Sequence, residues 1–535
     1  MRRIWIVTGT VVTVAAAAVA YQLGKHWKDY NYVGGRLKVD MSRPDALIRT
    51  TSLSKLPRDL LRVPIAKDVL TEDLAFYYEQ NEDRMGLNGA IKRIAYEHDL
   101  DWQDKLYASI FNEPAEVAFW RDGKGALRHY AVVMRRGLFT KALEEAAKVA
   151  LKDGQLKKAG DISTSNGNAL VLALEVNPRR TLLLISQGDR MVVLSDPGLL
   201  FDDSNSIVKE ARAAVSNWLE HDGALAKQFD LDNIAAATQP AATAQPADTA
   251  RHTLAIGAPT MALGYGAFVS GFKGMRFDFG GDWSTSVWLD SNKLTSAQLV
   301  DPALWTAAPA NPSACVVMPV DWAMVNKVLK EASAKPNLPE QALASLSGPG
   351  LACWYRESNL YSPVFIAKLP ANTANRDTTL QAMATWAIAT GEQAAPGKGK
   401  TKAKPDQKFW RNANSKATLA ASADFVVFSP DGGLVEKVID TIARSNPSVA
   451  DQNPGTQSTL GMITPRPLSE MAQREVYAAL SGPDDANFLD AAKTHLPARM
   501  KALASYPPIR LELSKTQTSG KAWHKVDWIS KEKAN

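Results

Sequence analysis

The sequence lacks the motifs on which metal and nucleotide chemistry depend. Its seven histidines are scattered, with no pair at metal-ligand spacing and no HExxH pattern, so zinc catalysis is disfavoured. No GxSxG elbow, P-loop or dinucleotide fingerprint occurs, and nothing in the sequence indicates a cofactor. Since 62 basic and 56 acidic residues are mixed along the chain, no concentrated basic face is expected, and nucleic-acid binding is not indicated.

Cysteine is scarce as well: the chain has two, Cys315 and Cys353. Each lies in a short apolar stretch that predicts a strand. In an oxidising compartment the two could pair if their strands were neighbours. The alternative is two separately buried thiols that act as small hydrophobic residues. The sequence alone leaves both open.

Long apolar runs are missing except at the N-terminus. Arg2 and Arg3 precede an uncharged run of 20 residues, Ile4–Leu23. This is long enough to span a bilayer as a helix, so residues 1–25 are predicted to be a signal anchor or transmembrane helix. The bulk of the chain would then be periplasmic, held by one pass through the inner membrane. Cleavage after Ala18-Val19-Ala20 is the alternative.

Aromatic residues follow this run. Tyr21, Trp27, Tyr30 and Tyr32 are placed where residues of a membrane-interface belt would lie, which favours a retained anchor over a cleaved one.

The rest of the chain contains a repeat at an offset of 234 residues. Trp120 and Trp354 hold the same place in similar segments, as do Ser195 and Ser429, and Arg276 and Arg510. A period this long exceeds that of solenoids and propellers. We therefore predict duplication of a whole domain, with repeats over residues 26–295 and 296–535.

Within each half, predicted strands come in hairpins with helices between them. Hairpins are expected over 115–134 and 350–369, and an added helix over 88–97 in the first half. This order lacks steady βαβ alternation and predicts the α+β class. We expect two internally duplicated domains, each with an antiparallel sheet and packed helices, after the N-terminal transmembrane helix.

One pattern could support catalysis. Ser52 and Lys55 match the S-x-x-K spacing in which a lysine activates a serine, as in penicillin-binding proteins. The motif is short and no SxN or KTG partner follows it. Leu56-Pro57 also disfavours the helix that the motif needs. An irregular segment leading into the first strand is the plainer interpretation.

The 14 tryptophans suggest a contact surface. Trp120 and Trp354 fit core positions. Trp283 and Trp288 fall in one terminal hairpin, and Trp523 and Trp528 in the other, so some of these indoles could be exposed to a protein or glycan partner.

The N-terminal segment, the stretch Leu60–Gln80, the Ser-Asp-Pro turn at 195–197 and the duplicated layout together resemble a bacterial envelope family, the YfaA-like proteins. That resemblance implies a periplasmic role beside a bacterial alpha-2-macroglobulin-type protease trap. The trap's thioester motif is absent here, since Val-Val follows Cys315 and Trp-Tyr follows Cys353. No catalytic residue carries over.

These observations favour a membrane-tethered periplasmic protein that is not an enzyme and binds an envelope protein, with an alpha-2-macroglobulin-like protein as one candidate partner. The alternative is a serine hydrolase acting on cell-wall peptide or ester through Ser52 and Lys55.

Overall fold

The structure is a computed structural model of the whole chain. It describes residues 30, 32–60, 62–63, 113–123, 127–135, 156–177, 180–233, 251–261, 272–281, 283–290, 301–318, 320, 322, 346, 348–388, 393–394, 407–412, 415–452, 458–480, 486–513 and 521–530. The chain divides into two compact units. Unit 1 contains Met1–Asn233, Gln245–Gly257 and Arg276–Trp283; unit 2 contains Ile234–Ala244, Ala258–Met275 and Ser284–Asn535.

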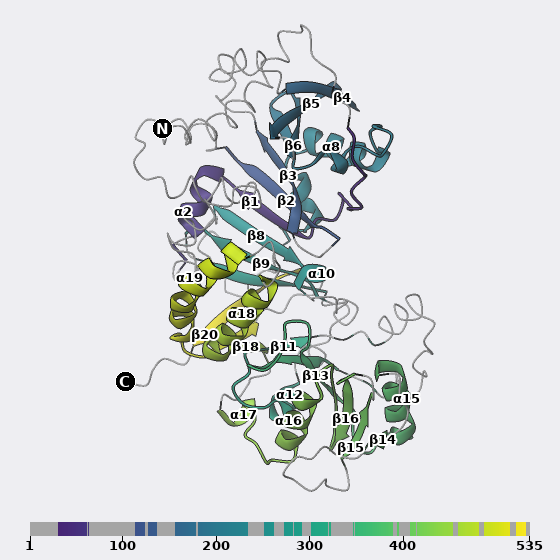
Figure 1. Cartoon of the computed structure of the whole chain (residues 1–535), viewed down its shortest axis with the longest axis vertical. Helices are drawn as coiled ribbons and strands as arrows, with labels where there is room; N and C mark the ends of the chain where they lie inside the picture. Colours follow the sequence, from purple (N-terminus) through teal and green to yellow (C-terminus); the bar gives the residue numbers. More distant parts are fainter. Residues whose placement is uncertain are drawn as a thin grey trace, which may run out of the picture. The chain divides into compact units, whose positions relative to one another are not determined.

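Unit 1 is built on antiparallel strands that pair in the order β4-β5-β6-β7-β3-β2-β1-β8, coloured purple to teal in Figure 1. Val and Leu fill both faces of several strands, a composition typical of strands that are covered on both sides. The strands are β1 Ala46–Thr50, β2 Ala115–Arg121, β3 Leu127–Arg135, β4 Leu156–Thr164, β5 Gly167–Asn177, β6 Arg180–Gln187, β7 Arg190–Leu194 and β8 His252–Gly257.

The helices of unit 1 are short, apart from α8, Lys209–Glu220. Its buried residues Ala211, Val215, Trp218 and Leu219 recur at helical spacing, and α8 packs on β4 and β7. The ring of Trp218 stacks on that of Trp120 with centroids 6.2 Å apart. The other helices are η1 Leu53–Lys55, α2 Leu56–Leu60, η2 Pro197–Leu199 and α9 Ala224–Gln228.

In unit 2 the strands pair in the order β14-β15-β16-β17-β13-β12-β11-β18-β19-β20-β10, again antiparallel throughout. They are β10 Ser284–Asp290, β11 Ala314–Met318, β12 Gly350–Trp354, β13 Val364–Lys368, β14 Gln393–Ala394, β15 Lys408–Arg411, β16 Thr418–Ser422, β17 Phe425–Ser429, β18 Thr459–Ile463, β19 Ile509–Leu513 and β20 Lys521–Ser530. Strand β9, Phe272–Phe279, is divided between the units.

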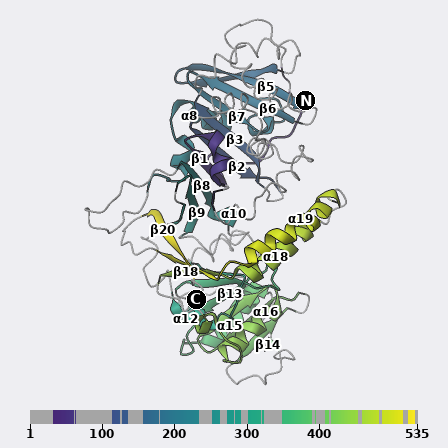
Figure 2. The same ribbon diagram turned by 90° about the vertical axis from the view of Figure 1, so that its left-hand side faces the viewer.

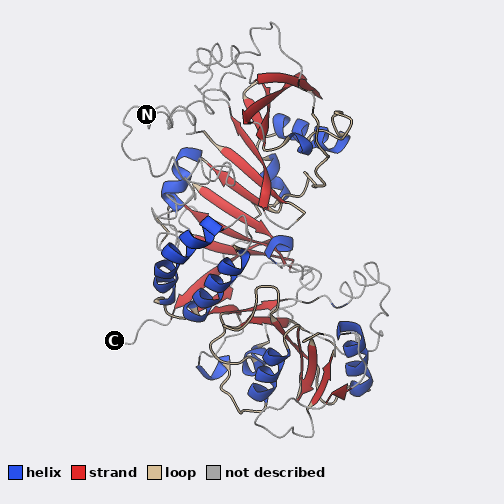
Figure 3. Ribbon diagram, in the orientation of Figure 1, coloured by secondary structure: helices blue, strands red, loops and turns tan. Residues whose placement is uncertain are grey.

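Helices cover both faces of the unit 2 strands, as the blue ribbons in Figure 3 show. The helices α12 Pro302–Ala307, α16 Gly432–Ile442 and α17 Val449–Gln452 form one core with β11–β13, whereas α15 Arg376–Ile388 packs over β15–β17 on the other face. Two further helices, α18 Pro465–Ala479 and α19 Ala486–Ala504, lie side by side in Figures 1 and 2. The remaining helix is α10 Ala258–Met261.

The strand order repeats between the units. The unit 1 order is β4-β5-β6-β7-β3-β2-β1-β8. When ten is added to each of these labels, the result is the first part of the unit 2 order, β14-β15-β16-β17-β13-β12-β11-β18. Local contacts recur at the sequence offset: Arg276 Nε donates to Asp278, and Arg510 forms an ion pair with Glu512. Thr253 donates to Asp278, as Thr459 does to Glu512, so both units contain the same threonine–carboxylate–arginine chain.

The predicted fold class is nevertheless wrong. Strands make up 39% and helices 30% of the described residues, and all 20 described strands belong to one antiparallel sheet, so the α+β expectation of two domains with a sheet each does not hold. The predicted first repeat, residues 26–295, includes β10, but β10 pairs with β20 of the predicted second repeat, and Trp288 lies opposite Trp523. Joining two strands covers backbone groups that each would otherwise expose at an edge. Hydrophobic periodicity cannot reveal such a partner.

Among the described residues, no helix is long and apolar enough to cross a membrane. The predicted transmembrane helix, the added helix over 88–97 and the boundary near residue 295 all fall outside the described residues. The predicted exposure of tryptophans is wrong for Trp288 and Trp523, each of which is 1% exposed. The hairpins over 115–134 and 350–369 are confirmed.

Candidate functional site

The structure places the S-x-x-K residues where β1 ends. Ser52 is buried just after β1, whereas the side chain of Lys55 is exposed and its backbone N–H donates to Ser52 O. The predicted irregular segment is wrong: η1 and α2 form there despite Pro57. Proline is tolerated near the start of a helix because the N–H that it lacks has no partner within the helix anyway. The hypothesis of an activated Ser52 remains a prediction.

Beside Ser52, the fold assembles a hydroxyl, an imidazole and a carboxylate in a row. The hydroxyl of Thr50 lies 2.7 Å from His252 Nδ1, and His252 Nε2 lies 3.0 Å from Asp59 Oδ2. The three side chains come from β1, β8 and α2. None of them is more than 2% exposed. The order of groups is that of a Ser-His-Asp triad with threonine in the place of serine, but the two imidazole nitrogens exchange roles, since Nδ1 faces the hydroxyl and Nε2 the carboxylate.

The electrostatics of this row favour a neutral imidazole. Burial lowers the pKa of His252, an effect that the Asp59 carboxylate opposes. Since a carboxylate accepts, Nε2–H donates to Asp59 and Nδ1 accepts from the Thr50 hydroxyl. That hydroxyl also accepts from the backbone N–H of Ser52 at 3.0 Å. Each polar atom of the row thus has a partner within the protein.

The surroundings hold the row in place. Arg251 and Arg62 lie 3.4 and 3.3 Å from the Asp59 carboxylate, and their side chains are 42% and 67% exposed. A Cβ at Gly280, where φ is +96°, would come within 2.8 Å of the His252 ring. The row therefore ties three segments of unit 1 together and is closed to a substrate. Thr459 of unit 2 corresponds to Thr253, and the residue before it is Ser458, whereas His252 precedes Thr253.

The sequence does not indicate that Asp59 and His252 meet, because they are 193 residues apart. A histidine in an apolar strand is the one hint that the sequence contains. Among the described residues, no group of three or more His, Cys, Asp or Glu side chains could hold a metal ion.

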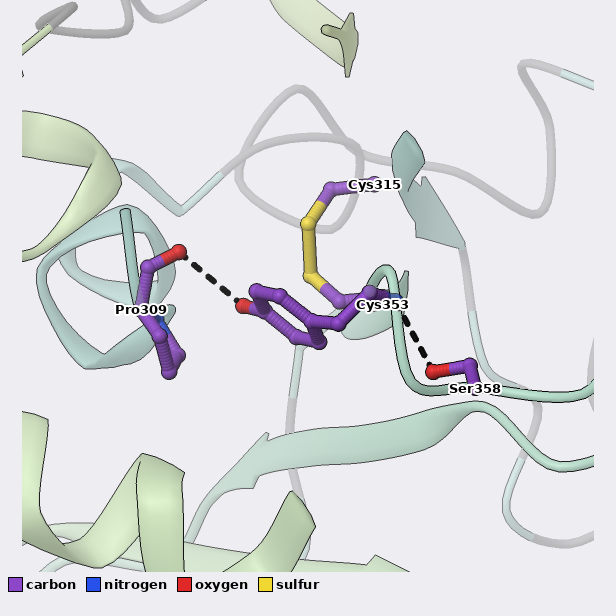
Figure 4. Close-up of a disulfide and its surroundings, with 5 residues drawn as sticks. Pro309, Cys315, Cys353 and Ser358 are labelled. Carbon is purple, nitrogen blue, oxygen red and sulfur yellow. Dashed lines mark hydrogen bonds between the residues drawn. A yellow bond between two sulfur atoms is a disulfide. The ribbon is translucent and has the colours of Figure 1, made fainter. Parts of the chain in front are cut away.

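In unit 2 the two cysteines form a disulfide (Figure 4). Cys315 of β11 lies directly opposite Cys353 of β12, and neither residue is exposed. Nearby, the hydroxyl of buried Tyr355 donates to Pro309 O at 3.0 Å, and the Tyr355 N–H donates to Ser358 Oγ at 2.8 Å. The disulfide and these bonds fasten the segment before β11 to the end of β12.

The turn that follows β12 presents an aromatic side chain to solvent. Tyr361 is 63% exposed and lies in residues 356–362, which we call the Tyr361 loop. The Trp354 indole donates to Leu360 O at 2.8 Å. From α18, the Arg474 guanidinium donates to the carbonyl oxygens of Arg356 and Ser358. The loop is thus an ordered surface element.

Basic side chains surround this loop. Arg356 and Arg466 are 69% and 79% exposed, and both pair with Glu470 of α18. Lys437 lies 4.5 Å from the centre of the Tyr355 ring. Tyrosine and arginine are enriched in protein interfaces and among the residues that dominate their binding energy.

A profile of the family described as "Uncharacterized protein conserved in bacteria (DUF2138)" matches residues 6–416 and 397–528. The chain belongs to this family. The resemblance to YfaA-like proteins is confirmed: this DUF2138 chain is 29% identical over 521 residues to "Uncharacterized protein YfaA" of Escherichia coli (strain K12). The match covers 92% of this chain and 90% of that protein. No solved structure matches.

Proposed function

We propose that this DUF2138 protein is a membrane-tethered periplasmic protein that is not an enzyme and binds a protein partner through the Tyr361 loop. The observation that carries the proposal is a 63% exposed tyrosine on a loop that arginine and tryptophan side chains hold in one conformation. An aromatic anchor that is ordered before binding loses little conformational entropy in a complex.

Two features support the compartment. The apolar segment Ile4–Leu23 after Arg2 and Arg3 has the composition of a membrane anchor. The disulfide between Cys315 and Cys353 suits an exported protein, since such bonds persist in oxidising spaces.

The partner would present apolar groups to Tyr361, since Arg356 and Arg466 are already paired with Glu470. An alpha-2-macroglobulin-like envelope protein is our candidate. Pull-down of the full chain from crosslinked envelopes, followed by mass spectrometry, would identify the partner directly.

A serine hydrolase remains the second candidate because Ser52 adjoins the Thr50–His252–Asp59 row. Burial weighs against it: Ser52 is 4% exposed and Thr50 is 2% exposed, so neither hydroxyl is open to a substrate. A catalytic nucleophile must lie within reach of the reacting group.

A photo-crosslinking amino acid at Tyr361 is expected to capture the partner in living cells, whereas the same group at Leu127, 46% exposed on β3, should not. Tyr361→Ala should weaken binding about tenfold or more, and Tyr361→Phe much less, since the ring supplies most of the contact. Equal capture at both positions, or unchanged affinity of Tyr361→Ala, would refute the assignment of this loop.

A further inference from the structure

The segment that follows the apolar N-terminal run is docked along unit 1. We call residues 32–40 the strap. The Tyr32 N–H donates to Asn205 Oδ1 at 2.8 Å, and the Arg36 N–H to Asp203 Oδ1 at 2.8 Å. The Leu37 N–H donates to Gly198 O at 2.9 Å. Three backbone donors of the strap are therefore satisfied by one loop, residues 198–205.

Side-chain packing confirms a close fit. The Tyr32 ring lies 6.2 Å from that of Phe201, which is 1% exposed. A Cβ at Gly198 would come within 2.7 Å of the Tyr32 hydroxyl and 2.8 Å of Gly35 O. The presence of glycine at position 198 is what allows the strap to approach this closely.

Both ends of the strap are fixed as well. Before it, the Tyr30 N–H donates to Lys158 O on β4 at 2.7 Å. At its far end, Asp40 O accepts from the buried Trp120 indole at 2.8 Å. Tyr30 and Tyr32 therefore contact the folded unit, and their place in a membrane-interface belt stays a prediction.

Docking shortens the tether. From Leu23 to Ala46, where β1 begins, an undocked chain of 23 steps could extend up to about 78 Å. Tyr30 is the first docked residue, and the chain from Leu23 to Tyr30 has seven residue steps and can extend to about 24 Å at most. The docked strap thus keeps Tyr30 within about 24 Å of the end of the apolar run.

We propose that the strap holds unit 1 against the phospholipid surface, with the side that carries the strap and residues 202–205 toward the bilayer. The inference rests on the proposed tethering through Ile4–Leu23. Charge does not drive the contact, because Asp202 and Asp203 lie on this face and would be repelled by anionic lipid. The length of the tether and the side on which the strap docks determine which face meets the membrane.

Energy transfer to an acceptor on lipid headgroups tests this with the full chain in nanodiscs. One donor dye is placed at Ser204→Cys, on the exposed part of the 198–205 loop that follows β7, and another at Lys55→Cys, in η1 after β1, which is separated from β7 by β3 and β2. Labelling without reductant leaves the native disulfide intact. We expect the energy-transfer efficiency of the dye at position 204 to be about twice that of the dye at position 55, or more. The reason is that several strand spacings of about 4.8 Å separate the two positions.

Undocking the strap should bring this ratio close to one. The variant combines Tyr32→Ala with Asn205→Gly, which removes the acceptor while suiting the φ of 56° at that position. Gly198→Val is a second undocking variant, and Leu127→Ala, at an exposed position of β3, is the control that should change nothing. Equal transfer from both positions in the parent chain would overturn the inference. Absence of the chain from nanodiscs would instead overturn the tethering itself.

Discussion

Removal of the disulfide is expected to lower the free energy of unfolding of unit 2 by about 4 kcal/mol, the loop-closure entropy of a bridge between residues 38 positions apart. The variant is Cys315→Ala with Cys353→Ala, because serine would add the cost of burying two hydroxyls at positions with no exposure. Urea unfolding followed by tryptophan fluorescence measures the effect.

The matched control is the parent protein under reducing conditions, which should lose a similar free energy without any change in sequence. A loss below about 1 kcal/mol in both would mean that the bridge does not constrain the unfolded chain as the entropy model requires. A large loss in the alanine variant alone would point to packing at Cys315 and Cys353 instead of the bridge.

Asp59→Ala is expected to destabilise unit 1 by about 3–5 kcal/mol, the typical cost of removing one partner from a buried charged hydrogen-bonded network. His252 Nε2–H would lose its acceptor in a position with no access to water. Asp59→Asn keeps an oxygen at the same place and should cost much less, about 1 kcal/mol.

Thermal and urea unfolding of the two variants gives the comparison. The decisive quantity is the difference between Asp59→Ala and Asp59→Asn. If both variants unfold at the same temperature and urea concentration as the parent protein, the Thr50–His252–Asp59 row does not stabilise the packing of β1, α2 and β8. A role other than stability must then explain the row.

Local features of the fold were predictable because short-range chemistry determines them. Alternating and continuous apolar runs located β2, β3, β12 and β13 and the hairpins that they form. Asp196 before Pro197 indicated a capped turn, and the Asp196 carboxylate accepts from the Gly198 N–H. In unit 2, Asp431 caps α16 in the same way, since its carboxylate accepts from the Gly433 N–H.

Long-range features were not predictable from one sequence. The pairing of β10 with β20, the row that joins Thr50, His252 and Asp59, and the strap all unite residues far apart in the chain. The adjacency of Cys315 and Cys353 stayed open for the same reason, since period-two patterning gives each strand but not its neighbour.

We propose that this DUF2138 chain is a binding protein and that its Thr50–His252–Asp59 row is structural. A fluorophosphonate probe tests it most directly on the full chain in detergent, with adducts mapped by mass spectrometry and trypsin as the positive control. We expect no adduct at Ser52 or Thr50, and the same background labelling in the parent and in Ser52→Ala. Stoichiometric labelling of Ser52 that disappears in Ser52→Ala and falls in His252→Ala would contradict the account and establish a serine hydrolase.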